Sequence, residues 1–323
     1  MTKRRIGIPK DFKVKDSDFL SAKSTGWALK MLGVHRAHKR GIKGKDVIVA
    51  IGDTGASLDH DSLPNPIAMW QGKFNDVKDK NGHGTHVWGV AYSVAPESHY
   101  IIAKVMGDDG RGGYMDIASG IMYSVDNGAH IINLSVGGPH NAYSKRIDDA
   151  IQYAWDNNVL IVVASGNSSG KVGYPAKDER VLAIGAIDEN GITANFQNKG
   201  IELDYVAPGV DIYSTWINNE YRWADGTSQA APYVSGFCAL IIGKYFEKYG
   251  SYPTIMETIG LLRKNSIDLK DIGFDVDTGH GIPSATAEGR IYLDNEFVES
   301  VNCQKKSNIW ASLVGSILSL FKQ

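Results

Sequence analysis

Apolar runs with the length of buried strands alternate with helical patterns through most of this 323-residue chain. The segments 116–127 and 144–157 have helical spacing. The expected strands are 47–51, 100–105, 130–134, 160–164, 181–187 and 203–206. Such alternation predicts an α/β fold, in which a mostly parallel central sheet is covered by helices on both faces. Ligand sites in these folds lie at the carboxyl ends of the strands.

Three glycine-rich motifs each hold one residue with catalytic chemistry. Asp53 ends an apolar run in IGDTG, His83 lies in NGHGTHV, and Ser228 lies in DGTSQA. A serine hydroxyl is a weak nucleophile that needs a base to take its proton, and the base needs a carboxylate to fix its tautomer. Asp, His and Ser in this order follow one of three unrelated chain orders in which such triads occur. The motifs therefore predict a Ser-His-Asp triad.

Together with further segments, these motifs resemble the subtilisin-like serine proteases, the subtilase family, over roughly residues 25 to 290. The further segments are INLSVGGP at 132–139, VVASGN at 162–167, GYP at 173–175 and YVAPG at 205–209. The resemblance implies a subtilisin-like three-layer fold and a serine endopeptidase that forms an acyl-enzyme. Within the family, the chain most resembles the intracellular subtilisins, which lack a signal peptide and a large folded prodomain.

The resemblance implies a role for each site residue. Ser228 would attack the scissile carbonyl, His83 would act as general base and then acid, and Asp53 would orient His83. Asn167 and the backbone N–H of Ser228 would form the oxyanion hole. The implied substrate-binding residues are Gly110, Gly112, Tyr114, Ser135, Val136, Gly137, Ala164, Gly166 and Gly173.

The same resemblance indicates the class of substrate. Backbone edges near Gly110–Tyr114 and Ser135–Gly137 would pair with an extended chain, which favours flexible or unfolded proteins and peptides. Because Gly166 and Gly173 have no side chains, we expect the primary pocket to admit large apolar or aromatic P1 residues.

We expect three parts in the chain: an N-terminal extension at 1–25, a catalytic domain at 26–292 and a tail at 293–323. In the extension, Ile8-Pro9 resembles the Ile-Pro element that blocks the active site of intracellular subtilisins. A proline lacks the N–H needed for strand pairing, so such a segment could occupy the cleft uncut. An ordinary unstructured terminus is the alternative.

The tail carries apolar residues at helical spacing between Ile309 and Phe321, which predicts an amphipathic helix. Packing on the catalytic domain, self-association or partner docking, and attachment to a membrane surface are its three candidate roles.

Bulk properties exclude several other classes of protein. The formal net charge is −2 and no basic block is present, so we expect no nucleic-acid partner. No run of about 18 apolar residues occurs, so we expect no membrane span. The N-terminus lacks the apolar stretch of a secretory signal, which predicts a cytoplasmic location. The two cysteines, Cys238 and Cys303, do not indicate a disulfide framework.

The resemblance implies no required cofactor, and the principal calcium site of subtilisins is expected to be missing. Residues 86–96 leave no room for the calcium loop that would fall between Ala91 and Val94, and Ser62 stands where an aspartate is expected. Calcium takes six to eight oxygen ligands, so these losses remove most of the set. A weaker calcium site near Ala176 or Asn195 is left open.

Other interpretations of these motifs compete with the triad. Asp-Thr-Gly at 53–55 and again at 277–279 is also the mark of aspartic proteases, although the second copy follows a poor core strand. His83 and His86 could suggest zinc, but no third ligand lies beside them, which favours a structural role for His86. A catalytically silent scaffold used for binding is a further alternative. We expect the charged residues Asp76, Lys78, Asp79 and Lys80 to form a solvated loop.

Overall fold

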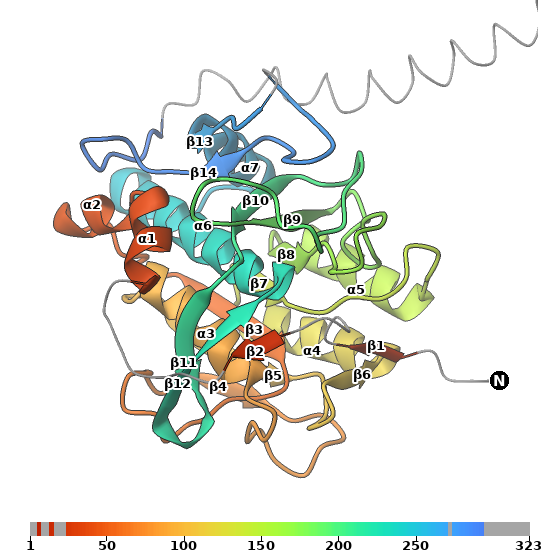
Figure 1. Ribbon diagram of the computed structural model, residues 1–323. Coiled ribbons are helices and arrows are strands. Elements are labelled where there is room, and N and C mark those ends of the chain that lie inside the picture. The colour runs from red at the N-terminus through yellow and green to blue at the C-terminus, as the bar shows by residue number, and fades with distance from the viewer. Residues whose placement is uncertain (1–4, 8–12, 16–23, 271–272, 294–323) are drawn as a thin grey trace, which may run out of the picture.

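The computed structural model describes residues 5–7, 13–15, 24–270 and 273–293, with backbone only for 5–7, 13–15 and 24–25. Its centre is a seven-stranded sheet in the order β10-β9-β8-β7-β3-β5-β4, and every neighbouring pair is parallel (Figure 1). The strands are β3 (Ile48–Asp53), β4 (Ala68–Trp70), β5 (His99–Lys104), β7 (Ile131–Leu134), β8 (Leu160–Ala164), β9 (Val181–Ile187) and β10 (Tyr205–Pro208).

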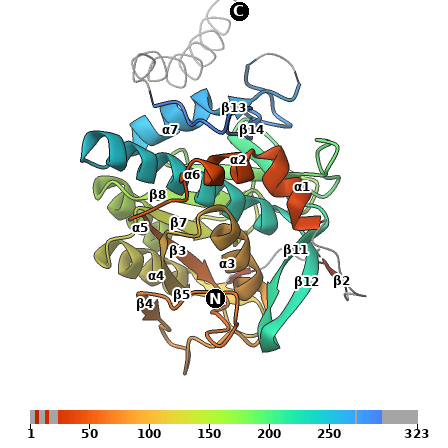
Figure 2. The same cartoon turned by 90° about the vertical axis from the view of Figure 1, so that its left-hand side faces the viewer.

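Helices cover both faces of this sheet. On one face, α3 (His83–Val94) and α6 (Thr227–Tyr249) pack against each other, and α6 crosses β7, β8 and β9. On the other face, α4 (Tyr114–Asp126) contacts β3 and β5, and α5 (Lys145–Asp156) contacts β8. Figure 2 shows α4 and α5 on one side of the strands and α3 on the other. The expected three-layer α/β fold is confirmed.

Among the described residues, three further helices lie outside these layers. They are α1 (Ser24–Met31), α2 (Val34–Lys39) and α7 (Ile255–Lys264), and a 3₁₀ turn covers Ile217–Asn219. The α7 helix packs on α6, and its first turn is closed by a capping box between Thr254 and Glu257.

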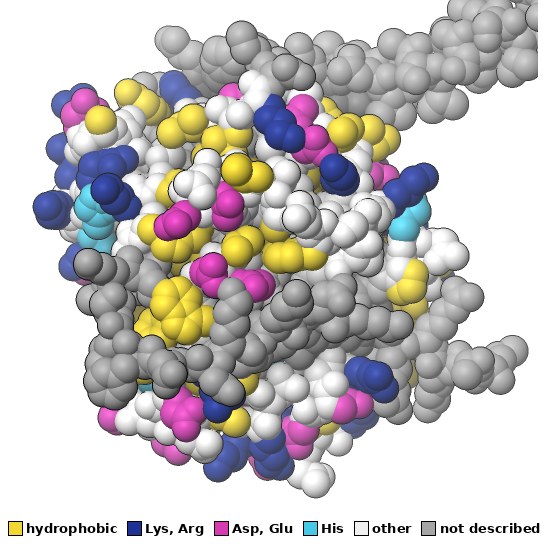
Figure 3. All heavy atoms as spheres, viewed as in Figure 1, with side chains coloured by type: hydrophobic (Ala, Val, Ile, Leu, Met, Phe, Trp, Pro, Cys, Tyr) yellow, Lys and Arg dark blue, Asp and Glu magenta, His cyan; other side chains and the backbone are white. Residues whose placement is uncertain are grey.

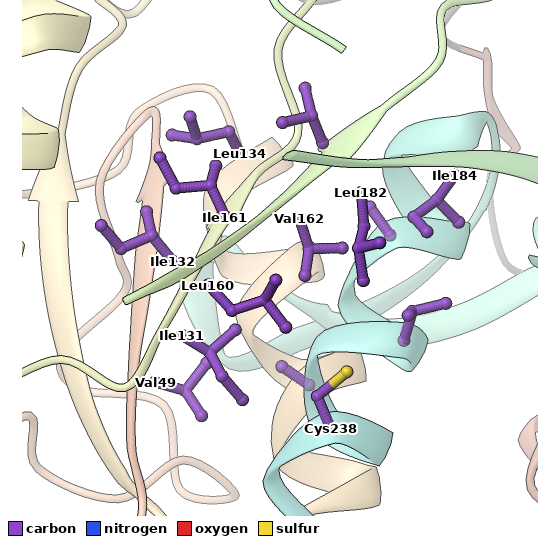
Figure 4. Packing of buried hydrophobic residues seen from close by; sticks show 14 of the residues in the cluster. Val49, Ile131, Ile132, Leu134, Leu160, Ile161, Val162, Leu182, Ile184 and Cys238 are labelled. Carbon is purple, nitrogen blue, oxygen red and sulfur yellow. The ribbon is translucent and has the colours of Figure 1, made fainter. Parts of the chain in front are cut away.

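The core covers both faces of the sheet, and Figure 4 shows the part that lies between the sheet and α6. Asn133, Val162 and Leu182 are register partners on adjacent strands, so their side chains share one face. That face meets α6, where Ser235 Oγ donates to Asn133 Oδ1 at 2.9 Å. Burial raises the pKa of the nearby Cys238 thiol to about 12, so it packs as a small neutral group. Each buried aliphatic side chain here contributes about 1.5–3 kcal/mol to folding.

Smaller sheets lie at the edges of the molecule. The hairpin of β11 (Ile212–Trp216) and β12 (Glu220–Asp225) carries a third strand, β2 (Lys13–Lys15), on the outer edge of β12. The strand β1 (Arg5–Gly7) pairs antiparallel with β6 (Arg111–Gly113). A third small sheet joins β13 (Ser266–Ile267) and β14 (Ile282–Pro283).

Sequence periodicity located the central strands well. The strands at 160–164 and 181–187 have the expected bounds, whereas the last one begins at Tyr205 rather than at 203. The edge strand β4 and the β11–β12 hairpin were not expected. Ile8-Pro9 and the amphipathic tail lie outside the described residues.

The described surface carries charges of both signs, in agreement with the formal net charge of −2. On the face shown in Figure 3, basic side chains lie mostly toward the rim, and acidic side chains also lie near the middle. Within the described residues, no helix is both long enough and apolar enough to cross a membrane.

Candidate active site

The aspartate and the histidine of the expected triad meet at the carboxyl edge of the sheet. Asp53 is the last residue of the central strand β3, and His83 is the first residue of α3. His83 Nδ1 donates to Asp53 Oδ1 at 2.7 Å, and both side chains are buried. A carboxylate oxygen only accepts, so a neutral imidazole carries its proton on Nδ1 and leaves Nε2 as the basic nitrogen. This is the tautomer that a general base for serine requires.

Ser228 lies in the first turn of α6, the helix that packs against α3. Its Oγ donates to the backbone oxygen of Ser135 at 3.4 Å, and Ser135 Oγ donates to the backbone oxygen of Ser228 at 2.9 Å. Ser135 directly follows β7. The first-turn position places the serine at the positive end of the helix dipole, which favours negative charge developing there.

Asn167 has the geometry of an oxyanion donor. Its Oδ1 accepts from the backbone N–H of Thr227 at 3.0 Å and from Thr227 Oγ1 at 2.7 Å. These two bonds fix the amide, and its buried Nδ2 has no hydrogen-bond partner among the described residues. An added Cβ on Gly226 would lie 3.1 Å from that nitrogen, so glycine keeps the space around it open. A buried, oriented and unused N–H is what stabilisation of an oxyanion needs.

Most of the substrate-binding residues that the sequence predicts lie at or next to the ends of strands. Gly110–Tyr114 surrounds β6, Ser135–Gly137 follows β7, and Ala164–Gly166 covers the end of β8. An added Cβ would lie 2.4 Å from Asn198 Nδ2 at Gly166 and 2.4 Å from Gly138 O at Gly173. Glycine is therefore needed at both positions because Asn198 and Gly138 of the same chain lie too close for a side chain. The expectation from the sequence was instead that these glycines leave the substrate pocket open.

His86 links α3 to the β11–β12 hairpin, which leads to Ser228. Its Nε2 donates to the backbone oxygens of Ile212 and Arg222, both at 3.1 Å. Burial, and then the charge of His83, lower the pKa of His86 to about 3, so the ring is neutral. No cluster of three or more His, Cys, Asp or Glu able to hold a metal occurs in the part of the chain that the structure describes.

The second Asp-Thr-Gly copy forms no aspartic-protease dyad with the first. Asp277 lies within 2.9 Å of Lys199 and 2.8 Å of Lys270, and the hydrogen bond from Lys270 is the main cause that lowers its pKa. Asp53 is bonded to His83 instead. The two carboxylates therefore have separate partners.

The expectation of a solvated loop at 76–80 is wrong for Asp79. Lys78 and Lys80 are exposed, but Asp79 is 1% exposed and accepts hydrogen bonds from the start of α3. A carboxylate is buried where it receives enough donors to replace water. The signal in the sequence was an acidic residue shortly before the start of a helix, where negative charge is favourable. Thr227, which holds Asn167, was also missed.

Comparison with known proteins agrees with this geometry. A family model described as "Subtilase family" matches residues 44–281. Subtilisin BL of Lederbergia lenta is 38% identical over 230 residues, which cover 68% of this chain and 85% of that protein. Subtilisin DY of Bacillus licheniformis is 36% identical over 240 residues, or 69% of this chain and 86% of that protein. Minor extracellular protease Epr of Bacillus subtilis is 33% identical over 310 residues, or 92% of this chain and 46% of that protein.

Proposed function

The chain belongs to the subtilase family of serine endopeptidases, and we propose that Asp53, His83 and Ser228 are its catalytic triad. Ser228 Oγ attacks the scissile carbonyl carbon while His83 Nε2 takes the hydroxyl proton. The oxyanion is held by Asn167 Nδ2 and the Ser228 backbone N–H. His83 then gives its proton to the leaving amine as the C–N bond breaks. Water, activated by the same imidazole, hydrolyses the acyl-enzyme.

The observation that carries this proposal is the 2.7 Å bond between His83 Nδ1 and Asp53 Oδ1. This bond leaves His83 Nε2 as the basic nitrogen. His83 lies on α3, which packs beside α6, the helix that carries Ser228. The test is hydrolysis of an unfolded protein by the purified chain and by Ser228→Ala, both freed of the N-terminal extension at 1–25. Product masses should show internal cleavage by the wild type alone, and equal cleavage by both proteins would refute the assignment.

We infer a preference for large apolar P1 side chains. In support, none of the nine predicted substrate-binding residues carries a charge, so none would pair with a charged P1 residue. Peptides that differ only at P1 test this preference. Phe and Leu peptides should have a higher kcat/KM than Arg and Glu peptides, and a preference for a charged P1 residue would overturn it.

We propose that the N-terminal extension keeps the full chain latent. The two strands of the extension occupy edges beside the site: β1 pairs with β6, where substrate is expected, and β2 pairs with β12, which ends three residues before Ser228. His83 and Ser228 each have 0% of their surface exposed in the full chain. A buried nucleophile cannot meet a polypeptide substrate until something moves. Ile8-Pro9, between the two strands, is the candidate blocking element.

Proline substitutions test latency without shortening the chain. Ile6→Pro with Val14→Pro removes one backbone N–H from each of β1 and β2, which should loosen both pairings. We expect the rate on a peptide substrate to rise about tenfold or more, as losing a few net hydrogen bonds predicts. The same prolines with Ser228→Ala form the control and should give no turnover. An unchanged rate would remove the inhibitory role.

We further propose that catalysis needs no cofactor, because the chemistry above uses only side chains and backbone of the chain. Activity in excess EDTA should equal activity in calcium, and a loss that calcium restores would identify a calcium site.

The resemblance of Ile8-Pro9 to the element of intracellular subtilisins supports a cytoplasmic site of action, which cell fractionation tests. Self-association through the 293–323 tail is tested by sedimentation of the full chain with and without apolar-to-polar substitutions there.

A further inference from the structure

We propose that Asp79 is a positioning residue of this active site, which fixes the first turn of α3 and thereby the imidazole of His83 relative to Asp53. The inference rests on the proposed triad and adds a residue that never touches substrate. Three sets of contacts carry it: those to α3, those to the residue after Asp53, and those that hold Asp79 itself.

The carboxylate of Asp79 caps the helix that begins with His83. Its Oδ1 accepts from the backbone N–H of Asn81 at 3.0 Å and of Gly82 at 2.9 Å. Its Oδ2 accepts from the backbone N–H of Thr85 at 2.9 Å and from Thr85 Oγ1 at 2.7 Å. Both oxygens are thus engaged, and the negative charge lies at the positive end of the helix. The backbone on either side of His83 is held by one rigid group.

The same carboxylate is tied to the residue that follows Asp53. Thr54 Oγ1 donates to Asp79 Oδ1 at 2.9 Å and accepts from the backbone N–H of Gly84 at 2.9 Å. The backbone N–H of Thr54 donates to Asp53 Oδ1 at 2.7 Å, the oxygen that also binds His83. Asp79 and Thr54 therefore connect the end of β3 to the start of α3 directly, independently of the Asp53–His83 bond.

Asp79 is itself held firmly. Its backbone N–H donates to Ala56 O at 3.0 Å, and the N–H of Ala56 donates to Val77 O at 3.0 Å. Lys104, which is 2% exposed, donates from Nζ to Lys78 O at 2.6 Å. The loop that carries Asp79 is thus bound to the strand ends of β3 and β5. Because Asp79 is held in place by the strand ends, its hydrogen bonds to the first turn of α3 also hold His83 in place.

Replacement by asparagine is the sharpest test. An amide offers one acceptor oxygen where the carboxylate offers two, so Asp79→Asn turns an NH₂ group toward N–H or O–H donors. We expect kcat to fall about 10–100-fold with little change in KM, since small misplacements of catalytic groups have costs of this size. The rate of labelling of Ser228 by a fluorophosphonate should fall by a similar factor, because it too needs His83 as base. Variants are compared in the same N-terminal form, established by intact mass.

Asp204→Asn is the matched control. Asp204 is also buried, and its Oδ2 accepts the backbone N–H of Ala183 at 2.9 Å, but it lies at the β9–β10 end of the sheet. We expect this variant to lower the Tm. Its kcat, calculated per active site titrated with the fluorophosphonate, should stay within about twofold of wild type. If Asp79→Asn behaves in the same way, Asp79 is only structural and the proposal is overturned.

A milder pair decides the question if Asp79→Asn does not fold. Thr54→Val removes the hydroxyl bridge, and Thr54→Ser keeps it. The valine variant should lose kcat and labelling rate, and the serine variant should recover most of both. Equal rates in the two variants would contradict the proposal. Absence of labelling in wild-type protein freed of its N-terminal extension would instead refute the triad itself, so the two failures are distinguishable.

Discussion

His83 Nδ1 and Asp53 Oδ1 are 2.7 Å apart, although the two residues come from different elements, a helix start and a strand end. The bond is buried, so water does not compete for it and its geometry selects one imidazole tautomer. The chemistry proposed for Ser228 depends on that selection.

Asp53→Asn should therefore lower kcat about 10⁴-fold while the protein stays folded. The amide can turn its NH₂ group toward Nδ1, which moves the ring proton to Nε2 and removes the base. Steady-state kinetics measure the loss, and circular dichroism checks the fold. A decrease of less than about tenfold would mean that another group orients His83.

Asn167→Ala should reduce kcat about 10²–10³-fold with KM nearly unchanged, a magnitude measured on subtilisin itself. The oxyanion exists only after attack on the carbonyl, so its donor acts on the transition state rather than on substrate binding. A variant with higher KM and normal kcat would show instead that the Asn167 amide binds the ground state.

The buried His86 should make stability depend on pH. In the folded chain its pKa is about 3, against 6.5 for a free histidine. Above pH 6.5 the ring is neutral in both states and has no effect. As the pH falls below 6.5, the unfolded chain gains the proton first, so stability is lost progressively down to about pH 3, by roughly 5 kcal/mol in total.

Chemical unfolding of the Ser228→Ala protein, in which autolysis is prevented, measures this dependence. His86→Gln retains an N–H donor for the two carbonyls but does not titrate, so its stability should fall less between pH 6.5 and 4. Burial also lowers the pKa of His130, which leaves a common slope in both proteins. If stability changed with pH equally in the proteins with and without His86, the lowered pKa of His86 would be contradicted.

Gln229, next to the proposed nucleophile Ser228, should make the enzyme resistant to peroxide. A methionine in this buried position would oxidise to a polar sulfoxide, which a glutamine cannot do. We expect wild-type activity to persist in peroxide and Gln229→Met to be inactivated. Methionine sulfoxide reductase should restore the variant. Equal inactivation of both proteins would place the sensitive residue elsewhere.

The sequence was sufficient to predict the central strands and the Asp53–His83 pair. Strands such as Leu160–Ala164 are apolar at every position because helices cover both faces of the sheet. The β11–β12 hairpin escaped notice because it lies at the edge, with partly exposed residues such as Tyr213 and Arg222 interrupting any apolar run.

The supporting contacts of the site could not be predicted in the same way. Asp79 lies in a locally polar segment, DVKDK at 76–80, and its burial comes from the loop folding back onto Ala56 and α3. The role of Thr227 depends on Asn167, which is 60 residues away. Tertiary contacts of this kind leave no local periodicity in the sequence.

The most direct measurement is intact-mass analysis of the purified full chain and of the same chain freed of its N-terminal extension, each before and after a fluorophosphonate probe. We predict a single adduct on Ser228 in the trimmed protein, little labelling of the full chain, and none in His83→Ala. Equal labelling of both forms would contradict the proposal that the N-terminal extension keeps the full chain latent. No adduct in either form, or one that persists in His83→Ala, would contradict an activated serine at this site.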